Sequence, residues 1–120
     1  MIRLGEFMRI LDKPISREEL KSIAGDMFGD MVKAVVDVRL DLLSIDAELH
    51  SDLEAVLLEK GSQQKDLWGI NLYPFLEGED FLEFDSMINM RPSQENMSRG
   101  VEDEVIRGEI VKIVNRWVMG

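Results

Sequence analysis

The fold is decided by residues 31–49, which read Met31-Val-Lys-Ala-Val-Val-Asp-Val-Arg-Leu-Asp-Leu-Leu-Ser-Ile-Asp-Ala-Glu-Leu49. Apolar residues occupy every second position over 32–38 and again over 43–49, with a short break at 39–41. A period of two is typical of a strand with one buried side. Two such runs with so short a break predict a β-hairpin.

Helix signals precede this hairpin and close the chain. Ser16 and Glu19 have the spacing of a capping box, apolar residues follow at helical intervals, and Gly29 offers a left-handed stop. Residues 103–119 begin with acidic residues, end with basic ones and carry a broad apolar stripe, as expected of a helix that packs on a sheet.

The remaining segments predict one short helix and three strands. Ser51 and Glu54 form a second candidate capping box, with about ten helical residues after it. Residues 8–11 indicate a short strand, and alternation over 68–73 and 82–90 indicates a second hairpin.

The predicted order is therefore β-α-β-β-α-β-β-α. It favours an α+β fold with a mainly antiparallel sheet of about five strands and three helices on one face. We treat residues 1–120 as a single domain, with 1–7 as a candidate N-terminal extension. The expected core comprises Phe28, Val36, Ile45, Leu57, Trp68, Phe84, Ile110 and Val114. The uncovered sheet face should carry Glu48, His50, Asn71, Tyr73, Glu83 and Asp85.

Composition excludes several classes of protein. The 120 residues include 45% hydrophobic residues and no cysteine, which permits a core but no disulfide or thiolate chemistry. No apolar run approaches the ~20 residues of a membrane helix, and we expect a cytoplasmic protein with no membrane partner. The net charge of −10 disfavours nucleic acid.

The only histidine lies in the most chemically suggestive run, residues 48–54. His50 and Asp52 are the candidate catalytic pair, with His50 as acid/base and Asp52 as its orienting group. The alternative is that Asp52 and Glu54 stabilise the helix N-terminus and His50 is a polar turn residue. With no second histidine, we expect neither a metal nor another cofactor.

Further polar residues lie near the predicted strand ends. If the strands that end at His50 and Arg91 both run antiparallel to the Trp68 strand, their ends converge with His50 and Asp52 at one end of the sheet. Arg91 would suit a small anionic ligand there, or form an internal ion pair. The candidate ligand-binding residues are Glu48, Asp66, Asn71, Tyr73, Asn89 and Arg91.

Three runs resemble the signature motifs of a small prokaryotic family known as a domain of unknown function. They are Glu48-Leu-His-Ser-Asp52, Asp66-Leu-Trp-Gly-Ile-Asn-Leu-Tyr-Pro74 and Ile88-Asn-Met-Arg-Pro92. The resemblance begins at Met8, and it implies no activity. Relatives carry an Asn-Arg-Ser run where this chain has Asn96-Met-Ser-Arg99, which leaves Arg99 without an inherited role.

These observations leave the function unknown and do not decide whether the protein is an enzyme. The first hypothesis is a binding or interaction module that pairs with itself as a homodimer, or with another protein, through an edge strand or the open sheet face. The alternative is a small hydrolase or small-molecule-binding enzyme that uses His50, Asp52 and Arg91. A third interpretation, an acidic partner of a basic protein, rests on charge alone.

Overall fold

The predicted hairpin of residues 31–49 forms the middle of the sheet. In a computed structural model that describes residues 9–119, β3 (Val32–Asp37) pairs antiparallel with β4 (Leu42–Ile45). Both oxygens of the buried Asp37 stabilise the connection. Its Oδ1 accepts from the amides of Arg39 and Leu40, each at 2.8 Å, and its Oδ2 accepts from the Ser62 hydroxyl at 2.6 Å. A carboxylate satisfied in this way can be buried beneath a tight turn.

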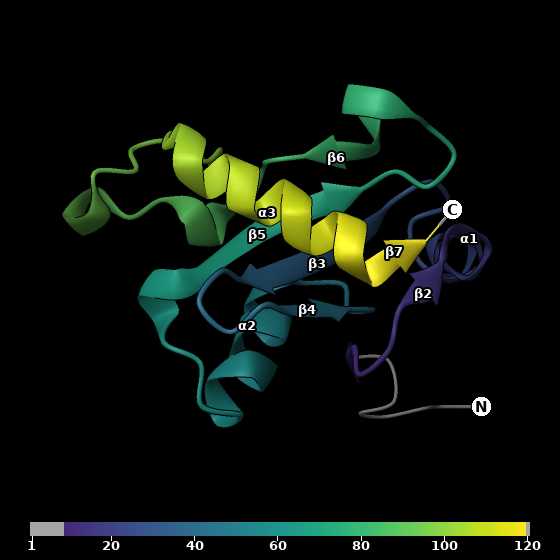
Figure 1. Cartoon of the computed structure of the whole chain (residues 1–120), viewed down its shortest axis with the longest axis horizontal. Coiled ribbons are helices and arrows are strands. Elements are labelled where there is room, and N and C mark those ends of the chain that lie inside the picture. The colour runs from purple at the N-terminus through teal and green to yellow at the C-terminus, as the bar shows by residue number, and fades with distance from the viewer. Residues whose placement is uncertain (1–8, 120) are drawn as a thin grey trace.

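The main sheet has five strands in the order β1-β4-β3-β5-β6, and every neighbouring pair is antiparallel (Figure 1). The α+β class and the mainly antiparallel sheet are therefore confirmed. The elements around the hairpin are β1 (Arg9–Ile10), β2 (Ile15–Ser16), α1 (Arg17–Asp26), α2 (His50–Glu59), β5 (Leu67–Leu72), β6 (Leu82–Glu83), α3 (Glu104–Trp117) and β7 (Val118–Met119). The parallel pair β2–β7, which joins the segment before α1 to the end of α3, was not expected.

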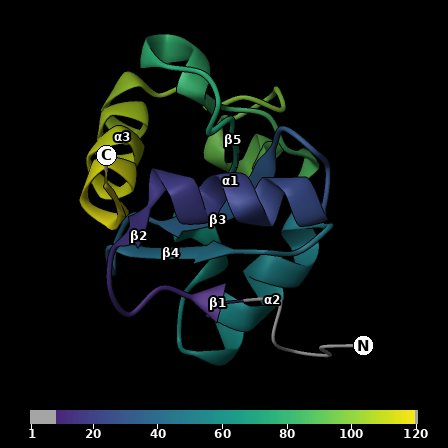
Figure 2. The ribbon, with the colours of Figure 1, turned by 90° about the vertical axis from the view of Figure 1, so that its right-hand side faces the viewer.

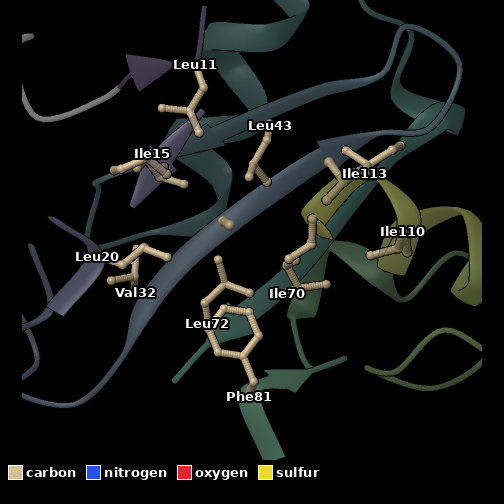
Figure 3. Packing of buried hydrophobic residues seen from close by; sticks show 14 of the residues in the cluster. Leu11, Ile15, Leu20, Val32, Leu43, Ile70, Leu72, Phe81, Ile110 and Ile113 are labelled. Carbon is tan, nitrogen blue, oxygen red and sulfur yellow. The ribbon is translucent and has the colours of Figure 1, made fainter. Parts of the chain in front are cut away.

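Helices cover both faces of the sheet, so the prediction of helices on one face is wrong. On the first face, α1 and α3 pack on β3, β4 and β5, and the side chains in Figure 3 meet there. Figure 1 shows α3 lying across this face, and Figure 2 shows α1 running alongside β3 and β4. On the second face, α2 buries Leu53 and Leu57 against Val35 and Leu67. Val35 lies on the polar side of the alternating run 32–38, so its side chain faces the second face and packs with α2.

The expected core residues divide between these two layers. Val36, Ile45, Trp68, Ile110 and Val114 belong to the first cluster, as predicted. The other three differ. Leu57 lies in the second cluster, Phe84 is half-buried, and Phe28 is 41% exposed because it follows the end of α1.

Local signals at the helix ends gave one correct and one wrong prediction. The Ser16 hydroxyl accepts from the amide of Glu19 at 3.1 Å, so the first helix begins as expected. The second capping box does not form, since α2 already begins at His50 and the residue at its N-cap, Leu49, makes no side-chain cap.

Two predicted strands are shorter than their alternation suggested. The strand of β4 ends at Ile45, where Asp46 turns the chain with a φ of 78°. The predicted strand 82–90 is reduced to Leu82–Glu83, and residues 84–100 then pass over the second face. The prediction that residues 1–7 form an N-terminal extension concerns residues outside the described part of the chain. Within residues 9–119, no helix combines the length and apolarity needed to cross a membrane.

Candidate functional site

Three polar residues lie side by side on the part of the second face beyond the α2 contact. Lys33 of β3 is the cross-strand partner of Asn71 in β5, and Asn71 is the partner of Glu83 in β6. Partners in adjacent strands project from the same face, so these side chains form one row, which we call the polar row. A cavity of about 470 Å³ lies over the polar row, and residues from 84–100 line its wall.

Asn71 is the centre of the cavity floor and is only 6% exposed. Its Nδ2 donates to Glu83 Oε1 at 2.9 Å and to the Asp85 carbonyl at 3.3 Å. Since both partners can only accept, the amide orientation is fixed, and Oδ1 must point away from them. Oδ1 is buried and has no hydrogen-bond partner among residues 9–119. An unsatisfied buried acceptor costs about 1–3 kcal/mol. Oδ1 has almost no accessible surface, so a molecule in the cavity does not reach it in this arrangement.

Glu83 is held in place from two sides. Its Oε1 accepts from Asn71 and also from the Tyr73 hydroxyl at 2.9 Å. Desolvation, the hydrogen bond to Glu83 and the negative charge of Glu83 raise the pKa of Tyr73 to about 12. The phenol therefore remains a neutral donor at physiological pH. Glu83 Oε2 makes no hydrogen bond within the described chain and is available to the cavity.

His50 forms part of the opposite wall in a single tautomer. Its Nε2 lies 2.8 Å from the carbonyl oxygen of Ile70, which can only accept, so Nε2 carries the proton. Nδ1 is then a lone-pair acceptor, and no residue in the described segment hydrogen-bonds to it. Burial is the main cause that lowers the pKa of His50.

This environment predicts a pH dependence of stability. Lys33 and Arg99 add to the lowering of the His50 pKa, while the Ile70 hydrogen bond and Asp85 oppose it. Because the unfolded chain takes up this proton near pH 6.5, stability is full above that value and falls as the pH drops from 6.5 through the folded pKa. We expect the NMR titration midpoint of His50 to lie below 6.5. His50→Gln keeps a donor to the Ile70 carbonyl but has no group that titrates in this range. Its free energy of unfolding should therefore fall less than that of the parent between pH 6.5 and the folded pKa. A midpoint above 6.5 would contradict the burial of the imidazole.

The two cations near the cavity differ in their pairing. Arg99 Nε donates to Asp85 Oδ1 at 2.7 Å, which neutralises both groups. Lys33 makes no ion pair with any described residue, and its Nζ lies 5.2 Å from the centroid of the Phe28 ring. Phe28 does not line the cavity, so the ammonium of Lys33 has its ring contact outside the lining.

Only part of the predicted site comes together here. His50, Asn71 and Tyr73 line the cavity, whereas Glu48 and Asp52 are exposed and do not. The orienting role predicted for Asp52 is taken by the Ile70 carbonyl, because β4 ends early and His50 enters α2.

Asp66 lies elsewhere, at the start of β5, where it pairs with Arg39 at 3.1 Å and Lys65 at 3.4 Å. The described residues contain no group of three or more metal-ligating His, Asp or Glu side chains.

Asn89 and Arg91 stabilise the edge of β5 instead of lining the cavity. Asn89 Oδ1 accepts from the Gly69 amide at 2.8 Å, and its Nδ2 donates to the Gly69 carbonyl at 2.9 Å, in the manner of a neighbouring strand. Arg91 donates to the Leu67 and Gln64 carbonyls and stacks 4.1 Å from the Trp68 ring centroid. The expected locus of His50, Asp52 and Arg91 is thus divided along β5, because His50 bonds at Ile70 and Arg91 at Leu67. Three residues of strand separate these points by about 10 Å.

The sequence did not identify Lys33 as a site residue. The alternation of residues 82–90 did place Glu83 and Asp85 on the polar face. A lysine on the same strand side as Val35 was a visible signal, but its proximity to Asn71 depends on the pairing of β3 with β5.

Comparison with known families agrees with the expected resemblance to a domain of unknown function. Residues 9–117 match the model of the family described as Protein of unknown function (DUF5674). The chain belongs to this family. Searches of curated proteins and of solved structures found no match. The match covers the five-stranded sheet, all three helices and the polar row, so the cavity lies within the domain that defines the family.

A second hollow, of about 620 Å³, lies between α3 and the β6 edge. Phe81, Leu82 and Val111 line it, and Arg107 lies 5.3 Å from the Phe84 ring centroid there. No side-chain-to-side-chain hydrogen bond joins the described residues of its lining. It therefore lacks a preorganised polar group such as Asn71, Tyr73 and Glu83 in the cavity over the polar row.

Proposed function

We propose that the protein binds a small polar molecule in the cavity over the polar row. The observation that carries this proposal is the preorganised floor of the cavity, where Asn71 Nδ2 and the Tyr73 hydroxyl both donate to Glu83 Oε1 and leave Oε2 without a hydrogen bond to any residue within 9–119. A carboxylate can accept hydrogen bonds at both of its oxygens. A ligand N–H or O–H group would supply a donor to Oε2.

The size and rigidity of the cavity support binding of a small molecule. Its volume of about 470 Å³ lies in the range of sites that enclose small ligands. Glu83, Tyr73 and Asn71 hold one another by hydrogen bonds before any ligand arrives. Such preorganisation lowers the entropic cost of binding.

Binding is better supported than hydrolysis or self-association. In the hydrolase hypothesis Asp52 orients His50, but the Ile70 carbonyl does so here and Asp52 is exposed. Association through an edge strand requires a row of free backbone groups, and the edge strands β1 and β6 have only two residues each. Asn89 and Arg91 occupy backbone groups of β5 beyond its short pairing with β6. A homodimer remains a prediction, and sedimentation at micromolar concentration tests it.

The proposal is tested by a fragment screen with two matched variants. Fragments that carry hydrogen-bond donors should shift the backbone amide signals of the polar row in ¹H–¹⁵N spectra. Ser51 is an exposed helical residue that lines the cavity, so Ser51→Trp should fill it and weaken binding about tenfold or more, equivalent to about 1.4 kcal/mol. Ser22→Trp makes the same change on the exposed side of α1 and should have no effect. Equal affinity in the two variants, or shifts confined to the hollow beside α3, would refute the proposal.

A further inference from the structure

We infer that the ligand is a small organic cation of the amino-alcohol class, with its ammonium group bound by Glu83 Oε2 and its hydroxyl group donating to His50 Nδ1. This inference rests on the proposed function and names the chemical class of its ligand. It follows from two acceptor atoms of the cavity lining that have no hydrogen-bond partner within residues 9–119.

The cationic end of the ligand is inferred from the charge of Glu83. Two neutral side-chain donors hold its Oε1, and no lysine or arginine among residues 9–119 forms an ion pair with this exposed carboxylate. Of the two cations that line the cavity, Arg99 is neutralised by Asp85. The ammonium of the other, Lys33, has its contact outside the lining, on the Phe28 ring. A ligand ammonium at Oε2 would supply the missing counter-charge, and partial enclosure would make this pair stronger than an exposed one.

The charges around Tyr73 support a cation at this end of the cavity. Desolvation and the hydrogen bond to Glu83 raise the pKa of Tyr73 to about 12, and the negative charges of Glu83, Asp30 and Asp85 add to the rise. Nearby carboxylates have this effect because they create a negative potential at the phenol. A ligand ammonium would be attracted into the same field, whereas a ligand carboxylate would be repelled from it.

The hydroxyl end of the ligand is inferred from the imidazole of His50. This residue is only 8% exposed, and its Nε2 is used by the Ile70 carbonyl at 2.8 Å. Nδ1 has no partner within residues 9–119, yet it is not among the fully buried atoms there that lack one, so it retains accessible surface. Because His50 lines the cavity, a ligand O–H group inside it can donate to this nitrogen.

The charges near His50 favour a neutral donor over a second ammonium group. Burial is the main cause that lowers the pKa of His50, and the positive charges of Lys33 and Arg99 lower it further against the opposing effect of Asp85. The imidazole is therefore neutral at pH 7.5 and accepts at Nδ1. A second cation on the ligand would be repelled by the same two positive charges, so a hydroxyl is the better donor there.

The spacing of the two acceptors fits a short aliphatic chain. His50 contacts β5 at Ile70 and lies close to Gly69, while Glu83 is the cross-strand partner of Asn71. One strand spacing of about 4.8 Å and one or two residues of about 3.3 Å separate these points of the backbone by about 6–8 Å. A chain of about five carbons, with bonds of about 1.5 Å, covers this interval. The apolar side chains of the lining that can contact such a chain are Met31, Leu49, Met87 and Ile88.

The test compares three probes that share a five-carbon chain. 5-Amino-1-pentanol has both groups, pentylamine lacks the hydroxyl, and 1-pentanol lacks the ammonium. Titrations at pH 7.5 followed by ¹H–¹⁵N spectra should give 5-amino-1-pentanol a dissociation constant about tenfold or more below that of 1-pentanol, since hydrogen bonds to charged groups are the stronger kind. The neutral hydrogen bond to His50 should lower it about threefold or more below that of pentylamine.

A matched pair of variants tests the contact with Glu83. Glu83→Gln keeps an acceptor for Asn71 and Tyr73 but removes the charge, so it should remove the advantage of 5-amino-1-pentanol over 1-pentanol. Glu79→Gln makes the same change at an exposed residue beside the other hollow and should leave that advantage intact.

The contact with His50 is followed at the imidazole itself. A donor at Nδ1 competes with the proton that this nitrogen takes up on titration. Saturation with 5-amino-1-pentanol should therefore lower the NMR titration midpoint of His50 more than saturation with pentylamine, which carries the same charge.

Each result separates this inference from the cavity proposal. Equal affinity of 5-amino-1-pentanol and 1-pentanol would overturn the ammonium contact with Glu83. Equal affinity of 5-amino-1-pentanol and pentylamine, or equal His50 midpoints with the two, would overturn the hydroxyl contact. If fragments bind in the cavity but none of the three probes does, the amino-alcohol class is wrong and the cavity proposal stands. If no fragment binds there either, both are wrong.

Discussion

Replacement of Asn89 by alanine should lower the free energy of unfolding by about 3–5 kcal/mol. The Asn89 side chain is fully buried and satisfies three backbone groups, the Gly69 amide, the Gly69 carbonyl and the Arg99 carbonyl at 2.9 Å. Alanine would leave these groups without partners, and each buried unsatisfied group costs about 1–3 kcal/mol. Urea unfolding followed by tryptophan fluorescence measures this change.

The matched control for Asn89 is Asn115→Ala, at an exposed position of α3. Surface changes of this kind alter stability by about 0.5 kcal/mol or less. A loss below about 1 kcal/mol for Asn89→Ala would show that the asparagine does not act as the partner of β5, and that another segment pairs with this edge.

Replacement of Gly69 by alanine should cost about 2–3 kcal/mol. A Cβ at this position would lie 2.5 Å from Ser86 Cβ, 2.6 Å from Ser86 Oγ and 3.2 Å from His50 Cδ2. Ser86 Cβ is attached directly to the backbone, so the clash must move the whole segment, and overpacking of this kind typically costs about 1–3 kcal/mol. The same movement should displace His50 and weaken binding in the cavity.

A second substitution identifies the cause of the Gly69 effect. Ser86→Gly removes both atoms that clash, at the cost of the hydrogen bond from the Ile88 amide to Ser86 Oγ. The double variant should therefore recover about 1 kcal/mol or more relative to the sum of the single changes. Additive losses would mean that the close approach of Ser86 is not the cause of the Gly69 effect.

The sequence predicted the parts of the fold that depend on neighbouring residues. The period of two over residues 32–38 predicted β3 and its hairpin, and Ser16 with Glu19 predicted the start of α1. Apolar alternation could not distinguish a true strand from residues 84–90, because Asn89 provides with its side chain the hydrogen bonds that a strand would provide with its backbone. The second layer packs on Val35 and Leu67 of the sheet, and only Val35 stood out in the sequence, as an apolar residue on the polar side of its run.

For the candidate site, the sequence could predict only which face of a strand each residue occupies. His50, Asn71 and Tyr73 were selected as polar residues of one sheet face, and all three line the cavity. Lys33 could not be joined to them, since a residue of β3 meets Asn71 only through the strand order of the sheet. Arg91 was expected near His50 because the strand predicted over residues 82–90 is longer than the observed strand, Leu82–Glu83.

The cavity proposal is tested most directly by a crystal structure after soaking with the fragments that shift the polar row. We predict density for a fragment inside the cavity, with one of its N–H or O–H groups about 2.7–3.2 Å from Glu83 Oε2. An empty cavity, or a fragment bound only in the hollow beside α3, would contradict the proposal.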